Sequence, residues 1–299
     1  MKTLDDKTIA AIRSHVESKK VTLGDGTVVP QLGQGTWFMG ENPRVKEQEI
    51  QALQLGIELG MTLIDTAEMY GEGGAELLVG EAIKGLRDNV FLVSKVYPHN
   101  SGLSSIAHAC EQSLQHLGTD RLDLYLLHWR GGIPLEETIN GMEQLKKEGK
   151  ILRWGVSNLD TADMEELVSA PQGKNCVTNQ VLYHLGSRGI EFDLLPWQRE
   201  QNMPIMAYCP LAQGGTLRKQ IMTNSTINEI AKAHHVKPLQ IALAWALRTN
   251  DVIAIPKAVQ QEHVIENATA ASIQLTQVDL DKLDQVFPKP RKKTHLDIV

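Results

Sequence analysis

The sequence has few cysteines and no long apolar run. Cys110, Cys176 and Cys209 lie far apart among 299 residues, which argues against a disulfide framework and against a zinc site of the CxxC type. No apolar stretch approaches the roughly 18 residues that span a membrane, and the charged N-terminus lacks the apolar centre of a signal peptide. We therefore expect a cytoplasmic protein without a membrane partner. We also expect it to be a monomer.

Strong charge of one sign and the common ligand motifs are also missing. The formal net charge is −6 with scattered basic residues, so no nucleic-acid partner is expected. No HExxH spacing occurs, and the adjacent His234 and His235 point apart on a helix, so we predict no metal site. The glycines of 71–74 do not fit a GxGxxG between a strand and a helix, which excludes a Rossmann fingerprint.

What is present is an alternation of short apolar runs with helical patterns. The runs are long enough for buried parallel strands. Most of them are separated by similar distances along the chain, and no change in composition marks a domain boundary. This favours an α/β fold with a single (β/α)₈ TIM barrel over an open doubly wound sheet. The expected strands lie within 31–37, 62–67, 90–96, 122–128, 151–158, 176–181, 204–210 and 252–258, and helical patterns cover 45–60, 75–86, 105–118, 135–150 and 227–247.

The beginning of the chain carries a different pattern. Residues 1–20 are predicted to be an N-terminal extension with a short helix, because Ile9, Ile12 and Val16 fall at helical spacing. Within 21–29, Asp25-Gly26 between apolar runs indicates a β-hairpin that covers the bottom of the barrel. The barrel domain is expected to occupy 21–299.

Four polar residues near three successive strand ends form the candidate catalytic group. They are Asp65, Tyr70, Lys95 and His128, and barrel closure brings such residues to one rim. A buried lysine beside a carboxylate stays charged, and the ammonium is expected to lower the pKa of the tyrosine, making it a general acid for a carbonyl oxygen. His128 is expected to orient the same oxygen by a hydrogen bond.

The later strand ends offer a way to bind a nucleotide. Ser157, Asn158 and Gln180 have groups that hydrogen-bond a carboxamide, and Tyr208 has a flat face for stacking. Lys257 precedes a helix start, which suits a phosphate.

Seven motifs along the chain resemble those of the aldo-keto reductase superfamily. Their sequences are similar to those of the bacterial reductases of small aldehydes such as methylglyoxal. They are DTAEMYG (65–71), VSKV (93–96), LLHW (126–129), WGVSN (154–158), TNQV (178–181), AYCPLA (207–212) and IPKA with EN (255–258, 266–267). The resemblance implies NADPH-dependent reduction of aldehydes and reactive dicarbonyls, with the four residues above as a catalytic tetrad and Tyr70 as proton donor.

The resemblance also implies two sets of contacts, with a small carbonyl compound as substrate. The cofactor would meet Thr36, Trp37, Asp65, Ser157, Asn158, Gln180, Tyr208, Cys209, Leu211, Lys257, His263, Glu266 and Asn267. The substrate would meet Trp37, Phe38, Tyr70, Tyr97, His128 and Trp129.

Three features bear on specificity. His263 stands where many members have an arginine that pairs with the 2′-phosphate, so use of NADH is possible beside NADPH. Cys209 replaces a common serine near the pyrophosphate, although a small buried residue there has an equally simple packing explanation. The tail after residue 287 is short, which predicts an open pocket and broad specificity.

Two other functions fit the same fold. One is a cofactor-binding sensor or regulatory subunit with little turnover, against which the intact tetrad argues. The other is a Schiff-base aldolase with Lys95 as nucleophile, which Asp65 disfavours because it keeps the amine charged.

Overall fold

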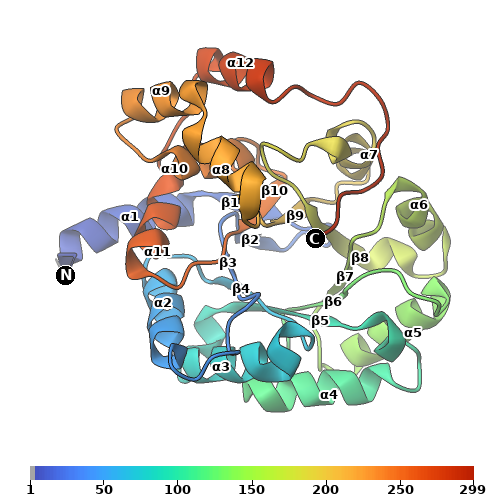
Figure 1. Ribbon diagram of the computed structural model, residues 1–299. Coiled ribbons are helices and arrows are strands. Elements are labelled where there is room, and N and C mark those ends of the chain that lie inside the picture. The colour runs from blue at the N-terminus through green and yellow to red at the C-terminus, as the bar shows by residue number, and fades with distance from the viewer. Residues whose placement is uncertain (1–3) are drawn as a thin grey trace.

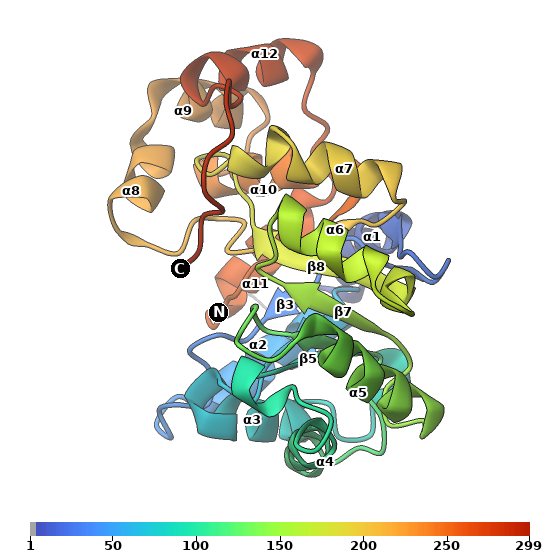
Figure 2. The same ribbon diagram turned by 90° about the vertical axis from the view of Figure 1, so that its right-hand side faces the viewer.

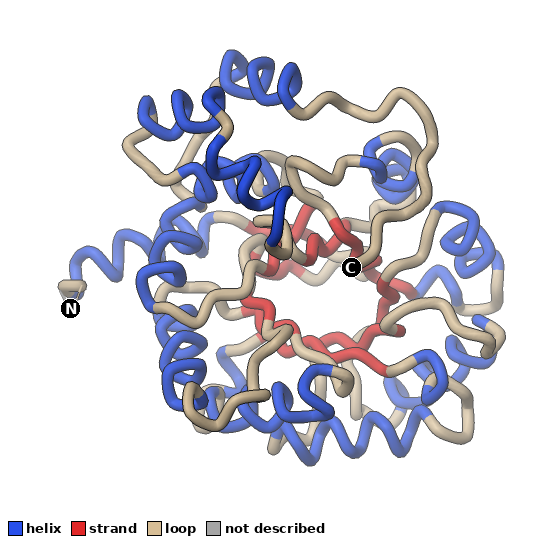
Figure 3. The backbone as a smooth tube through the Cα atoms, in the orientation of Figure 1, coloured by secondary structure: helices blue, strands red, loops and turns tan. Residues whose placement is uncertain are grey.

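The computed structural model describes residues 4–299, and its centre is a barrel of eight parallel strands (Figures 1 and 3). Neighbouring strands pair in sequence order from β3 to β10. The ring closes because the Gly33 N–H donates to the carbonyl of Ala254 at 2.9 Å. The strands are β3 Gln34–Gly35, β4 Leu63–Asp65, β5 Phe91–Val96, β6 Leu124–Leu127, β7 Trp154–Ser157, β8 Cys176–Leu182, β9 Ile205–Tyr208 and β10 Val252–Ile255. The predicted (β/α)₈ barrel is confirmed.

Helices form a ring outside the strands (Figure 3). They are α1 Asp6–Ser18, α2 Lys46–Glu58, α3 Gly74–Ala82, α4 Ile106–Leu117, α5 Leu135–Lys147, α6 Thr161–Ser169, α7 Leu194–Glu200, α8 Gly215–Thr223, α9 Ser225–Ala233, α10 Pro238–Ala246, α11 Gln261–Ala270 and α12 Gln277–Val286. The single helical pattern expected over 227–247 was wrong, because the chain breaks at His235, whose φ is 56°, and restarts with Pro238 in the first turn of α10.

The predicted hairpin closes the lower end of the barrel. Strands β1 (Lys20–Thr22) and β2 (Val28–Pro30) pair antiparallel. Val21, Leu23 and Val29 are buried in one cluster with apolar residues near the lower ends of the barrel strands, among them Leu63 and Leu124. The apolar plug shields the interior from water at that end.

The two-residue period of the strands explains how charges come to face the interior. In β5, Leu92 and Val96 pack among the helices, whereas Val93 belongs to the interior cluster. Lys95 follows Val93 by two residues and therefore faces the interior. Asp65 follows the interior residue Leu63 in β4 by the same step. Both charges thus reach the upper interior of the barrel.

At the two ends of the chain, segments pack on the outside of the barrel. Ile12 and Val16 of α1 are buried in the main core, while the first three residues of the predicted extension lie outside the described part. Its separation from a barrel domain stays a prediction. The last segment runs from α12 past α7 to the mouth of the barrel (Figure 2). Lys293 binds Asp193 at 2.7 Å and fastens the segment there.

None of the helices described in residues 4–299 combines the length and apolarity needed to cross a bilayer. Within the same residues, no group of three or more His, Cys, Asp or Glu side chains is placed to hold a metal ion.

Candidate active site

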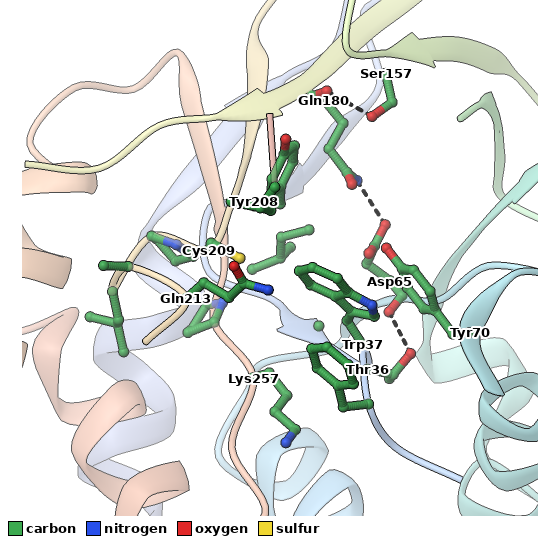
Figure 4. A pocket seen from close by; sticks show the side chains of 18 of the residues that line it. Thr36, Trp37, Asp65, Tyr70, Ser157, Gln180, Tyr208, Cys209, Gln213 and Lys257 are labelled. Carbon is green, nitrogen blue, oxygen red and sulfur yellow. Dashed lines mark hydrogen bonds between the residues drawn. The ribbon is translucent and has the colours of Figure 1, made fainter. Parts of the chain in front are cut away.

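A cavity of about 720 Å³ opens at the C-terminal ends of the strands, within the size range of small-molecule sites. Most of the predicted site residues line it. They are Thr36, Trp37, Phe38, Asp65, Tyr70, His128, Trp129, Ser157, Asn158, Gln180, Tyr208, Cys209, Leu211, Lys257 and His263. Figure 4 shows Lys257 across the cavity from Tyr70, with Trp37 between them.

The floor of the cavity holds a buried ion pair. Lys95 Nζ donates to Asp65 Oδ2 at 2.7 Å, to the carbonyl of Thr66 at 2.8 Å and to the hydroxyl of Tyr70 at 3.1 Å. The Lys95 side chain is 0% exposed. Its three N–H groups therefore meet three oxygen atoms, which is how a buried ammonium is stabilised. An amine held in this way has no lone pair free, and this argues against Lys95 as a Schiff-base nucleophile.

Asp65 is held from several sides. Gln180 Nε2 donates to Asp65 Oδ1 at 2.7 Å, and the Thr36 hydroxyl donates to the backbone carbonyl of Asp65 at 3.0 Å (Figure 4). Burial raises the pKa of Asp65, while Lys95 and Gln180 lower it. Burial lowers the pKa of Lys95, and Asp65 opposes that change. Both oxygens of the carboxylate are thus satisfied, and the carboxylate holds the ammonium in place.

The expectation of a lowered tyrosine pKa was wrong. Burial raises the pKa of Tyr70 well above its usual value, and the Asp65 charge adds to the increase. The reason is that Asp65 cancels much of the field of Lys95, while the buried phenolate would lose its hydration. Tyr70 is therefore protonated at neutral pH, which is the state that a proton donor needs.

His128 is a neutral imidazole beside the tyrosine. Its ring centroid lies 5.7 Å from that of Tyr70 with an edge-on angle of 74°. Burial, helped by the charge of Lys95, lowers the pKa of His128 to about 2. Within residues 4–299, Nδ1 of His128 has no hydrogen-bond partner. A neutral ring next to the acid can hydrogen-bond a substrate oxygen without adding charge.

The residues predicted to hold a carboxamide lie together above the tetrad. Asn158 Nδ2 donates to the carbonyl of His128 and to Ser157 Oγ, both at 3.2 Å, and the Tyr208 hydroxyl donates to Asn158 Oδ1 at 2.9 Å. Ser157 Oγ donates to the carbonyl of Gln180 at 2.8 Å (Figure 4). These bonds fix the side chains before any ligand arrives. Their contact with a cofactor stays a prediction.

Three of the predicted contact residues are not in the lining. Tyr97 stands behind Trp129, with ring centroids 5.8 Å apart at 90°. Asn267 is buried in α11, and Glu266 forms an ion pair with Lys237. The motif spacing placed them on the correct elements but could not show which way each side chain points.

Residues that were not predicted from the sequence also line the cavity. Arg218 of α8, Gln213 and Arg130 line it, as do Ile298 and Val299. The expectation that a short tail leaves the pocket open was wrong, because the tail folds back to the cavity. The Ser187 hydroxyl donates to Asp297 at 2.5 Å and helps to hold it there. The charged residues within 287–297 could have indicated that the tail is bound to the protein. Their partners, however, lie about a hundred residues earlier in the sequence, so the pairing could not be predicted.

With this geometry in view, comparison with known proteins defines the class. Residues 31–287 match the model of the aldo/keto reductase family, and the chain belongs to that family of oxidoreductases. The resemblance found in the motifs is thus confirmed.

Particular relatives sharpen the comparison. The chain is 55% identical over 284 residues to methylglyoxal reductase YeaE of Escherichia coli, covering 95% of this chain and 100% of the relative. It is 34% identical to the glyoxal reductase of Bacillus subtilis, covering 88% and 91%. A Klebsiella pneumoniae aldo/keto reductase, solved in complex with NADP and acetate, is 54% identical with a TM-score of 0.92 over 94% of this chain and 99% of that one.

Proposed function

We propose that the protein reduces aldehydes and reactive dicarbonyls, such as methylglyoxal, to alcohols with NADPH. The observation that carries the proposal is the protonated Tyr70, 3.1 Å from the buried Lys95 at the floor of the cavity. Relatives named as methylglyoxal and glyoxal reductases support the substrate class. The experiment is to follow NADPH oxidation with methylglyoxal as substrate, and no carbonyl-dependent oxidation would contradict the proposal.

The cavity has the donor set that a nicotinamide cofactor needs. Ser157, Asn158 and Gln180 carry amide and hydroxyl groups for the carboxamide, Tyr208 offers an aromatic face, and Lys257 supplies a cation for phosphate. The Klebsiella relative was solved with NADP bound. When bound, the cofactor supplies the hydride that goes to the carbonyl carbon.

The chain's own residues provide the other half of the reaction. Tyr70 donates its phenolic proton to the carbonyl oxygen, and Lys95 at 3.1 Å stabilises the negative charge that develops on the phenolic oxygen. Neutral His128 orients the same oxygen. Trp37 and Trp129 line the cavity beside these groups and exclude water from the reacting atoms.

We also propose that the protein works as a monomer in the cytoplasm. The three cysteines are free, and such usage is typical of a reducing compartment. Size-exclusion chromatography with light scattering tests the oligomeric state, and a stable dimer would contradict it.

The protonation states predict how the two reaction directions depend on pH. Reduction needs protonated Tyr70 and neutral His128, and the pKa of the first is raised while that of the second is lowered to about 2. We therefore expect the kcat for reduction to show no titration of either group between about pH 5 and 8. Oxidation of the alcohol needs the tyrosinate and should rise with pH. A reduction profile that collapses near neutral pH would contradict these assignments.

The position of Arg218 bears on the preference for NADPH over NADH. It lines the same cavity as Lys257 and His263, and its helix α8 packs against α10, which packs against α11, the helix of His263. Among the described lining residues the acidic side chain is Asp65, at the floor near Tyr70. A second cation thus lines the cavity that also holds His263, the residue at the position of the family arginine. We propose that Arg218 binds the 2′-phosphate of NADPH.

The change Arg218→Met should then weaken NADPH binding by about tenfold or more, because a hydrogen bond between charged groups contributes roughly 1.5–3 kcal/mol. NADH binding should stay the same, since NADH lacks that phosphate. Fluorescence titration with each cofactor measures both affinities. Lys219→Met is the matched control, because Lys219 is the exposed neighbour on the same helix. Equal weakening of both cofactors would contradict the 2′-phosphate contact.

A further inference from the structure

The segment that carries Tyr70 has an unusual backbone. Tyr70 begins a short 3₁₀ turn, η1 (Tyr70–Gly73), in which Gly71, Glu72 and Gly73 have φ values of 58°, 52° and 89°. A left-handed conformation is uncommon for a residue such as Glu72. The Tyr70 N–H donates to the carbonyl of Ala67 at 3.1 Å and the Glu72 N–H to that of Met69 at 3.3 Å. These short-range bonds shape the backbone, whereas the position of the Tyr70 hydroxyl relative to Lys95 also depends on how the segment is joined to β5.

Glu68, two residues before Tyr70, makes such contacts. Its Oε1 accepts a hydrogen bond from the backbone N–H of Tyr97 at 2.6 Å and from Asn100 Nδ2 at 3.2 Å. Its own N–H donates to the carbonyl of Lys95 at 3.3 Å. Glu68 therefore joins the segment of Tyr70 directly to the end of β5, which carries Lys95.

The same contacts extend toward the substrate side of the cavity. Glu68 binds the backbone N–H of Tyr97. The ring of Tyr97 packs edge-on with that of Trp129, with centroids 5.8 Å apart. Trp129 lines the cavity and lies 4.9 Å from the ring of His128. The Glu68 carboxylate is thus connected to the segment of Tyr70 on one side and, through Tyr97, to Trp129 on the other.

We propose that Glu68 is a positioning residue, whose carboxylate oxygen sets the distance between the Tyr70 hydroxyl and Lys95 Nζ and steadies Trp129 through Tyr97. The proposal rests on the proposed function, because it assigns Glu68 a part in carbonyl reduction. Glu68 acts through its neighbours, and it is not among the described residues that line the cavity.

Two properties of Glu68 can be tested separately: the position of its acceptor oxygen and its negative charge. What the geometry needs is an acceptor oxygen at the right distance, and burial raises the pKa of Glu68, so the site does not favour the charge itself. Glu68→Gln keeps the oxygen and removes the charge. Glu68→Asp keeps the charge but shortens the side chain by one methylene, which takes the oxygen away from the Tyr97 N–H.

The test compares these variants in NADPH-dependent reduction of methylglyoxal and of a bulkier aromatic aldehyde. We expect Glu68→Asp and Glu68→Ala to lower kcat by about tenfold or more, since small misplacements of reacting groups are costly. The KM for the aromatic aldehyde should rise, because Trp129 loses its support, while NADPH affinity stays unchanged. Glu68→Gln should keep kcat within about threefold of the wild type, because it retains the acceptor oxygen and with it the position of the reacting groups.

A matched control is available in α5, where Glu137 holds the loop that follows β5. Glu137 Oε1 accepts a hydrogen bond from the backbone N–H of Leu103 at 3.0 Å, so Glu137→Ala removes the same kind of bond farther from the tetrad and should leave kcat unchanged. The proposal is overturned if Glu68→Asp keeps full kcat, or if Glu68→Gln loses as much as Glu68→Asp. A wild-type protein with no carbonyl-dependent turnover would instead contradict the proposed function.

Discussion

Replacing Tyr70 with phenylalanine is expected to lower kcat for methylglyoxal reduction by about 10²- to 10⁴-fold, the usual contribution of a general acid. In the proposed mechanism the phenol, 3.1 Å from Lys95, is the proton donor, and phenylalanine has no proton to give. The Trp37 ring, whose centroid is 6.4 Å from that of Tyr70, keeps an aromatic neighbour. NADPH affinity should therefore remain close to that of the wild type. Steady-state kinetics and cofactor titration measure the two quantities.

The cofactor titration is the control for this variant. A loss of kcat with retained NADPH affinity shows that the cavity is intact and that the proton donor is missing. Near-full turnover by Tyr70→Phe would contradict the assignment, and the proton would then have to come from another group.

The second large effect is expected for Lys95→Met. The change leaves Asp65 buried without its cation, and breaking one side of a buried pair costs about 3–5 kcal/mol of unfolding free energy. The same change removes the ammonium that we propose stabilises charge on Tyr70, so kcat should fall as well. Urea denaturation measures the loss of stability, and turnover with methylglyoxal measures the loss of activity.

A surface pair offers the matched control for Lys95→Met. Lys46 and Glu81 also form an ion pair, but their side chains are 47% and 52% exposed. Lys46→Met should cost no more than about 1 kcal/mol. The double variant Asp65→Asn with Lys95→Met should recover part of the stability but none of the activity. Equal stability of Lys95→Met and the wild type would contradict the role given to the pair.

The fold could be predicted because local patterns repeat. Eight apolar runs alternate with helical patterns, and each observed strand lies inside or close to a predicted run. The break between α9 and α10 was missed because a continuous apolar pattern hid the turn at His235 and the start at Pro238. The path of the last residues was missed because it depends on long-range partners, such as Lys293 with Asp193.

The site was predicted as far as strand order determines it. Asp65 and Lys95 meet because neighbouring strands bring their ends together and the two-residue period turns both side chains inward. Tyr70 and His128 follow the ends of β4 and β6, so strand order places them at the same rim. The pKa of Tyr70 was predicted in the wrong direction because its sign depends on burial against two opposite charges, which spacing does not show. Arg218 was missed for a similar reason, since α8 reaches the cavity through a long excursion between β9 and β10.

Transfer of a labelled hydride tests the central claim most directly. The protein is incubated with methylglyoxal and NADPH deuterated at the transferring position of the nicotinamide, and the alcohol is examined by mass spectrometry. Deuterium is expected on the new carbinol carbon, in proportion to the NADPH consumed, and it should be nearly absent with Tyr70→Phe. Unlabelled alcohol, or NADPH consumption that does not depend on the carbonyl compound, would contradict the central claim.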